Sequence, residues 1–279
     1  MKPTRHRRKF GSLRARHRHV FLRRLTVSFI FIFLAFTLSV WLVNRPQFGI
    51  KTVEITGVSS YQPLELESAA ARSLSGFYAG LVPRSLSFIY PKKEIVQTLL
   101  KEFRAVKEVS IERYGFEALL IRVVERDSDA LWCRTEKVRD ECYVMDSKGL
   151  VFRGVRDQSE KEELGAITYY GFLDSLESPV GAVYLSPERL SEIKTFLGTL
   201  KGIGFAATSF ERTEDKEYHV ILERGSRLIL KEDVDFSHAL SNLSSLLGDP
   251  ELKALFEQTP LPFEYIDLRL PSKVFYRRK

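Results

Sequence analysis

The stretch L-T-V-S-F-I-F-I-F-L-A-F-T-L-S-V-W-L-V, from Leu25 to Val43, decides how the rest of this chain is organised. Its 19 residues carry no charge and are flanked by Arg24 and Arg45. A helix of this length spans about 28 Å, close to the roughly 30 Å of a bilayer's hydrocarbon core. Because the run is longer than a signal-peptide core and no Ala-x-Ala-like site precedes Arg45, we expect a retained transmembrane helix at residues 25–43.

Basic residues on one side of this run set the expected orientation. Residues 1–24 carry ten Lys and Arg and no Asp or Glu, whereas the ten residues after the run carry only Arg45 and Lys51. The positive-inside rule therefore predicts a cytoplasmic tail at residues 1–24, with the bulk of the chain outside the inner membrane. The alternative is that the tail is an RNA- or DNA-binding arm, and it could also touch anionic lipid.

The charge of the remaining chain argues against a nucleic-acid partner. The formal net charge of +7, less the tail's +10, leaves −3 for everything beyond residue 24. Binding to nucleic acid depends strongly on basic side chains that neutralise phosphates. We therefore expect no nucleic-acid binding by the folded part. The apolar content of 44% and charged content of 28% of the whole chain are typical of folded proteins.

A first folded region is expected at residues 48–126, after a short linker containing Pro46. Apolar residues alternate before Gly57 and again across residues 109–111 and 119–123, which indicates strands. Residues 63–74 and the segment after Pro91 place apolar side chains at intervals of four, which indicates two helices. The predicted order is β-α-α-β-β, with a turn at Gly115.

A second, β-rich region is expected at residues 131–279. Ser186 and Asp235 each precede an amphipathic segment and are expected to cap two helices. Strand-like runs occupy residues 142–145, 150–153, 167–170, 205–210, 218–222, 227–230, 265–268 and 274–276. The fold class is therefore α+β, with helices packed on a mainly antiparallel sheet.

The sequence offers no recognisable catalytic or metal-binding constellation. His219 and His238, the histidines outside the tail, are far apart in the sequence and belong to no Cys/His or H-E-x-x-H pattern. Gly202 and Gly204 follow a helix and precede a strand, the reverse of a phosphate-binding loop, so we interpret them as a turn. We expect no catalytic residues, no cofactor, no metal and no small-molecule substrate.

Cys133 and Cys142 are the two cysteines of the chain, and both lie on the side expected to be exported. In an oxidising compartment they could form a disulfide across one hairpin. The other interpretation is a pair of free structural thiols.

Four motifs stand out along the chain. They are F-G-I-K-T-V-E-I-T-G at residues 48–57, the segment from Pro91-Lys92-Lys93 to V-S-I-E-R ending at Arg113, I-R-V-V-E-R at residues 121–126, and Y-I-D-L-R at residues 265–269. Together they resemble the FtsQ/DivIB family of bacterial cell-division proteins. The chain departs from the family at Tyr114-Gly115-Phe116, where a Trp-Pro pair is usual. It departs again at Asp127 and Ser128, where a proline is usual.

This resemblance implies a bitopic protein of the division septum in which residues 48–126 form a POTRA domain. It implies a non-enzymatic scaffold that binds FtsB/DivIC-like and FtsL-like membrane proteins and links early division proteins, through an FtsW/FtsI-like septal synthase, to peptidoglycan synthesis. One alternative is a POTRA-containing factor for outer-membrane assembly or secretion, for which the residues after Arg126 are too few and too charged to form a typical barrel. Another is a membrane-tethered envelope hydrolase.

The expected partner-binding site is the C-terminal hairpin. A terminal strand is expected at a sheet edge, where unpaired main-chain groups can accept a partner strand, and the resemblance implies the same edge. The alternative is that residues 274–276 only pack as a last strand, with the edge blunted by Arg277, Arg278 and Lys279. The candidate residues are Tyr265, Ile266, Leu268, Arg269, Ser272, Val274, Phe275 and Tyr276.

Overall fold

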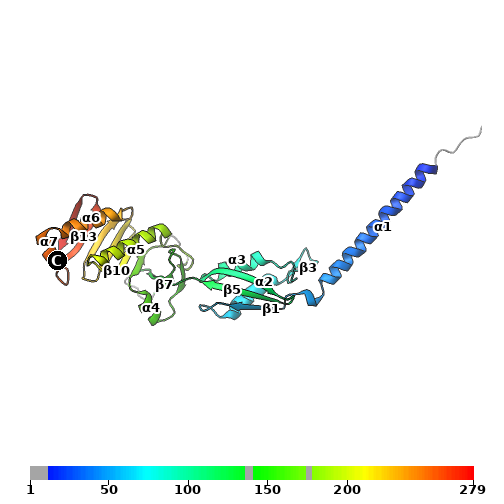
Figure 1. Ribbon diagram of the computed structural model, residues 1–279, viewed down its shortest axis with the longest axis horizontal. Helices are drawn as coiled ribbons and strands as arrows, with labels where there is room; N and C mark the ends of the chain where they lie inside the picture. Colours follow the sequence, from blue (N-terminus) through cyan, green and yellow to red (C-terminus); the bar gives the residue numbers. More distant parts are fainter. Residues whose placement is uncertain (1–11, 136–140, 174–177) are drawn as a thin grey trace, which may run out of the picture. The chain divides into compact units, whose positions relative to one another are not determined.

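The computed structural model describes residues 12–135, 141–173 and 178–279, and it has a mixed α+β fold (Figure 1). The chain divides into two compact units. The first comprises Met1–Glu102 and Glu108–Val124, and the second comprises Phe103–Lys107 and Glu125–Lys279.

The first unit begins with one long helix, α1 (Ser12–Val43) (Figure 1). Its segment Phe21–Val43 is long and apolar enough to cross a membrane, and the side chains described there are almost all exposed. The helix starts 13 residues before Leu25, so part of the expected basic tail is helical. A short 3-10 turn, η1 (Pro46–Phe48), follows α1 and leads into the next part of the unit.

A three-stranded sheet and two helices complete the first unit. The strands β1 (Thr52–Thr56), β5 (Ala118–Glu125) and β4 (Val106–Tyr114) lie in that order, and β1 runs parallel to β5. Helix α2 (Pro63–Leu74) packs against α3 (Lys92–Glu102) and against β1.

The two helices bury the apolar positions that recur every four residues, but a hairpin between them interrupts the expected order β-α-α-β-β. The core they share with the sheet includes Leu66, Ala70, Ile95, Leu99, Leu119 and Ile121. A two-stranded hairpin between the helices, β2 (Phe77–Tyr78) with β3 (Val82–Pro83), was not expected from the sequence. The turn after β4 has Gly115 at a φ of 65°, a conformation that glycine adopts without strain.

The second unit is built on a nine-stranded sheet with the order β14-β13-β12-β11-β10-β9-β6-β7-β8. Neighbours are mainly antiparallel, but β9 runs parallel to both β6 and β10, and β12 runs parallel to β13. The strands are β6 (Ala130–Cys133), β7 (Cys142–Met145), β8 (Val151–Gly154), β9 (Thr168–Gly171), β10 (Ala207–Arg212), β11 (Glu217–Leu222), β12 (Arg227–Lys231), β13 (Phe263–Leu270) and β14 (Lys273–Arg278).

Helices α5 (Pro187–Gly202) and α6 (Phe236–Leu247) lie along one face of this sheet (Figure 1). Both begin as expected: the Ser186 side chain accepts a hydrogen bond from the Arg189 N–H, and Asp235 accepts from the N–H groups of Ser237 and His238. The apolar stripes of these helices bury against the sheet in one core, which includes Leu190, Ile193, Phe196, Leu243, Phe210, Val220, Leu228, Phe263, Ile266 and Leu268. Two short helices, α4 (Gln158–Leu164) and α7 (Pro250–Phe256), were not expected from the sequence.

Strands β6 and β7 are joined by a disulfide between Cys133 and Cys142. The two cysteines lie directly opposite each other in the antiparallel register. The structure therefore has the hairpin disulfide, rather than two free thiols.

Candidate partner-binding site

The C-terminal hairpin, β13 with β14, forms one end of the nine-stranded sheet. β13 pairs in parallel with β12 on one side and antiparallel with β14 on the other, so that Ile266 lies opposite Tyr276 and Asp267 opposite Phe275. β14 has β13 as its only neighbour among the strands that the structure describes. Its outer side therefore has main-chain groups that another strand could pair with.

The structure separates the eight candidate residues by exposure. Ile266 and Leu268 are fully buried in the core that α6 helps to form, so they support the strand from inside and do not offer side chains to a partner. Tyr265, Arg269 and Val274 are half-buried, and Ser272 is exposed in the turn. Phe275 and Tyr276 are the most outward apolar candidates, with 53% and 39% of their surface exposed.

Phe275 and Tyr276 lie on opposite faces of β14, because neighbouring residues of a strand alternate. The Tyr276 ring packs edge-on against Phe263 of the core at 5.2 Å between centroids, and Val274, on the same face, also packs against the core. Phe275 lines a groove of about 830 Å³ with Asp267 and Arg269. A strand that paired with β14 would meet one aromatic side chain on each face.

Charged side chains fix the floor of this groove. The Arg269 guanidinium donates to both oxygens of Asp267 (Nε to Oδ1 2.9 Å, Nη2 to Oδ2 2.6 Å) and also to Glu217 of β11. These bonds raise the pKa of Arg269. Burial raises the pKa of Asp267, but the hydrogen bonds from Arg269 outweigh it, and the net shift is downward. Arg269 and Asp267 therefore both stay charged near neutral pH.

Polar contacts from neighbouring segments hold the hairpin in place. The Asn242 side chain in α6 donates to the carbonyl of Pro271 in the turn (3.0 Å), and Lys279 donates through Nζ to the carbonyl of Gly225 (2.8 Å). Arg277 pairs with Glu264 across the hairpin at 3.1 Å. The edge is therefore supported at the turn, along its length and at its end.

The opposite end of the sheet differs from β14, because another segment covers it. There the N–H of Val151 in β8 donates to the carbonyl of Ala182 (2.9 Å), and the N–H of Gly181 donates to the carbonyl of Val151 (2.7 Å). Leu150, just before β8, forms a further bridge with Val183. The segment 181–183 thus occupies main-chain groups of β8 that would otherwise be open to a partner.

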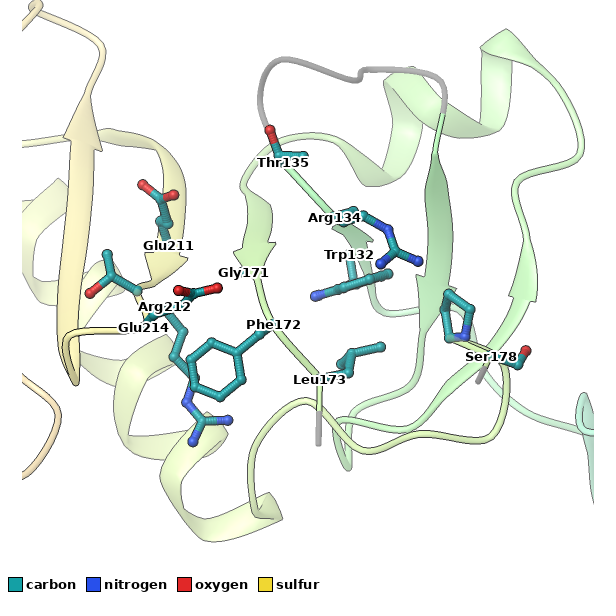
Figure 2. A pocket seen from close by; sticks show the side chains of 12 residues that line it. Trp132, Arg134, Thr135, Gly171, Phe172, Leu173, Ser178, Glu211, Arg212 and Glu214 are labelled. Carbon is teal, nitrogen blue, oxygen red and sulfur yellow. The ribbon is translucent and has the colours of Figure 1, made fainter. Parts of the chain in front are cut away.

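A second cavity of about 560 Å³ lies where β6, β9 and β10 meet (Figure 2). Figure 2 shows Arg212 beside Phe172, with the guanidinium carbon 4.2 Å from the ring centroid. Arg212 also pairs with Glu232 (2.7 Å) and so is held by the protein itself. The wall opposite carries Trp132, whose buried indole N–H has no hydrogen-bond acceptor among the described atoms.

The two histidines of the folded part have acidic neighbours. His219 is mostly buried, and its Nε2 lies 3.3 Å from Glu217 and its Nδ1 3.8 Å from Glu211. His238 is exposed in the first turn of α6, with its Nδ1 3.9 Å from Asp235. Within residues 12–135, 141–173 and 178–279, no group of three or more His, Cys, Asp or Glu is placed to hold a metal ion. Gly202 ends α5 and Gly204, at a φ of 91°, forms the turn after it.

Sequence reasoning did not identify Asn242 and Glu217 as parts of this site. Each reaches the hairpin from a distant segment, 29 residues from Pro271 and 52 residues from Arg269 respectively. No local motif marks either residue, since an Asn in a helix and a Glu in a strand are ordinary surface choices. Comparison with protein-family models and with curated proteins gives no match to this chain.

Proposed function

We propose that this chain is a single-pass membrane protein of the FtsQ/DivIB type, whose C-terminal sheet binds partner proteins by accepting a strand at β14. The observation that carries the proposal is the contrast between the two ends of the sheet. The segment 181–183 covers β8, whereas β14 exposes its outer edge together with Phe275 and Tyr276. An open edge of this kind suits recognition by β-augmentation, in which main-chain hydrogen bonds supply affinity and side chains supply selectivity.

The proposed topology places the tail in the cytoplasm and the chain beyond α1, from about Arg45 onward, outside. The ten basic residues before Leu25 and the two that follow Val43, Arg45 and Lys51, support this orientation. The Cys133–Cys142 disulfide agrees with an oxidising compartment such as the bacterial periplasm or cell exterior. The three-stranded unit after the helix, with its two packed helices, is proposed to be the POTRA domain that the sequence resemblance implies.

The proposed partners are FtsB/DivIC-like and FtsL-like membrane proteins and, through them, an FtsW/FtsI-like septal peptidoglycan synthase at the division site. In this proposal the chain performs no reaction itself and acts by holding the partners together. Three basic residues, Arg277, Arg278 and Lys279, follow the exposed aromatics, so an acidic segment of a partner would complement the end of β14.

Proline substitutions test the edge directly, because proline removes a main-chain donor. Neighbouring residues of an edge strand direct their N–H groups to opposite sides, so one of Phe275→Pro and Tyr276→Pro must remove an outward donor. We expect that variant, and truncation after Ser272, to lose the partners when the full chain is purified from solubilised membranes. Phe275→Ser and Tyr276→Ser are the matched controls, because they remove the same side chains and keep the N–H; they should retain more partner than the effective proline variant.

Thermal melting of each variant separates loss of binding from loss of folding. A truncated chain that melts as the parent does and still retains the partners would exclude β14 as the binding site. The surface of α3, from Pro91 to Phe103, would then be the next candidate.

A further inference from the structure

A cluster of aromatic side chains lies on the surface of the first unit, in the part of the unit that comes directly after the membrane helix α1. Phe48, Phe88 and Phe116 form a triangle with ring centroids 6.3, 6.1 and 5.4 Å apart. Phe88 and Phe116 are exposed and Phe48 is half-buried. Ile89, next to Phe88 in the chain, and Tyr114, two positions before Phe116, are more exposed still. These five residues are called the juxtamembrane patch below. Large apolar side chains that gather on a surface indicate an interaction site.

The strand register fixes which end of the unit carries the patch. β1 and β5 run parallel with Thr52 opposite Ala118 and Thr56 opposite Arg122, so the segment before β1 lies beside the start of β5. The N–H of Lys51 donates to the carbonyl of Glu117 (2.7 Å), which joins the two segments directly. Val124, another exposed apolar residue, lies at the other end of β5, about 20 to 25 Å away at the usual rise per residue.

The covalent chain keeps the patch close to the bilayer. Phe48 follows Val43, the last residue of α1, by five positions, a reach of no more than about 17 Å for a fully extended chain. The Asn44 side chain limits this separation further, because it donates a hydrogen bond to the carbonyl of Leu81, at the tip of the β2–β3 hairpin (3.0 Å). Tethering of this kind gives a surface a high effective concentration at the membrane without any further contact.

The polar groups around the patch match a membrane interface. The Arg113 guanidinium lies over the rings of Phe88 and Phe116, 5.3 and 5.8 Å from their centroids, and donates to the carbonyl of Ser87. Arg45 lies over Trp41 at 3.7 Å at the end of the helix. Aromatic rings that enter the headgroup layer beside arginines that reach phosphates are the usual composition of an interfacial anchor.

From these observations we infer that the juxtamembrane patch docks on the outer leaflet of the membrane that α1 spans, and so fixes the orientation of the first unit on the bilayer. The inference rests on the membrane anchoring in the proposed function. Its occupant is the lipid interface rather than a protein, because a linker of four residues, 44–47, holds the patch within reach of lipid at all times. Phe48, Phe88, Ile89 and Phe116 enter the headgroup layer, and Arg113 contacts lipid phosphate.

Quenching of tryptophan fluorescence by brominated lipid tests the docking. The full chain, in a Trp41→Phe background, is reconstituted into vesicles of brominated phosphatidylcholine and phosphatidylglycerol, with Tyr114→Trp as the probe. Val124→Trp is the matched control, since Val124 is an exposed residue (52%) at the far end of β5. The background chain gives the signal of Trp132, which is buried. We expect quenching at position 114 to exceed that at position 124 by about twofold or more, as for an interfacial aromatic. We expect Phe88→Ser with Phe116→Ser to remove the excess.

The outcomes distinguish this inference from the proposed function. A chain that floats with the vesicles but shows equal quenching at positions 114 and 124 overturns the docking and leaves the anchor intact. Failure to float overturns the anchor, and the inference falls with it. A third outcome is that the emission of the tryptophan at position 114 is blue-shifted but is not quenched by brominated lipid. If that emission returns to that of a solvent-exposed tryptophan when the protein is diluted in lipid, a second copy of the chain covers the patch. This outcome also overturns the inference.

Discussion

Asn242 of α6 donates a hydrogen bond to the main-chain carbonyl of Pro271, 3.0 Å away in the turn between β13 and β14. The contact joins a helix that covers the core to the tip of the hairpin proposed to bind partners. Through this contact the turn that precedes β14 is held against the covered face of the sheet.

Asn242→Ala should loosen the hairpin without unfolding the unit. A single neutral hydrogen bond contributes about 0.5–1.5 kcal/mol, so the melting temperature should fall only slightly. Amide hydrogen exchange in β14 should speed up by about three- to tenfold, which corresponds to that free energy, whereas exchange in β11 should be unchanged. Ser241→Ala, at the adjacent exposed position, is the control. Unaltered protection of β14 in the Asn242 variant would show that the turn is held by other contacts.

Glu160 gives a pH-dependent contribution to stability. It is buried and accepts hydrogen bonds from Arg153 (Nη1 to Oε2 2.8 Å) and from Arg156 (Nη2 to Oε1 2.8 Å). The Arg153 bond is the main cause that lowers the pKa of Glu160 to about 2, against an opposing effect of burial. Because the folded-state pKa is depressed, the stabilisation is present above the unfolded-state value of about 4.5 and is lost as pH falls toward about 2.

Glu160→Gln should therefore destabilise the second unit most at neutral pH, by about 2 to 3 kcal/mol. Urea unfolding at several pH values should show the gap between parent and variant narrowing as pH falls from 4.5 toward 2. Glu162→Gln, at an exposed position, is the control, and its free energy of unfolding should differ little from the parent's. If Glu160→Gln lowers the free energy of unfolding by the same amount at pH 7 and pH 3, the pH-dependent stabilisation by Glu160 is contradicted.

The disulfide should be present in protein extracted from membranes under non-reducing conditions. Mass spectrometry should recover the peptides of Cys133 and Cys142 as a linked pair. Reduction, or replacement of both cysteines by serine, should lower the free energy of unfolding by about 2 to 3 kcal/mol, the value for a loop of this length in the chain-entropy model. Complete alkylation of both cysteines before reduction would show that they are free in the cell.

Protease protection tests the orientation. A protease added outside spheroplasts should digest the chain beyond about Arg45 and leave a fragment with the tail and the membrane helix. The reason is the excess of Lys and Arg in residues 1–24, before the apolar run, which resists translocation. A protected large fragment that becomes sensitive only after lysis would reverse the topology.

Local signals explain why much of the fold could be predicted. The helix of residues 63–74 has the expected bounds, because a proline at its first position and regular apolar spacing define it. Ser186 and Asp235 cap their helices through side-chain oxygens that accept main-chain N–H groups, an interaction confined to a few residues. The short α4 and α7 lack such a long apolar pattern and were missed. The order of the nine strands also depends on pairing between distant segments, such as β9 between β6 and β10.

The candidate site shows the same limit. The hairpin at residues 265–276 was visible in the sequence, but the division between buried Ile266 and Leu268 and exposed Phe275 depends on α6 and on irregular register between the strands. Likewise, the cover over β8 comes from residues 181–183, about 30 positions further along the chain, and no strand pattern marks them. Exposure and edge protection arise from tertiary packing, which residue alternation alone does not specify.

The central place of β9 has a mechanical consequence. Its four residues, Thr168–Gly171, pair with β6 on one side and with β10 on the other, so the main-chain bonds of both halves of the sheet meet on this strand. If a partner is bound to β14 while α1 is anchored in the membrane, tension between them acts on the main-chain hydrogen bonds on either side of β9. β9 shares three paired positions with β6 and four with β10, and β12 shares three with β13. Under tension, the sheet would therefore separate first at one of these short parallel contacts.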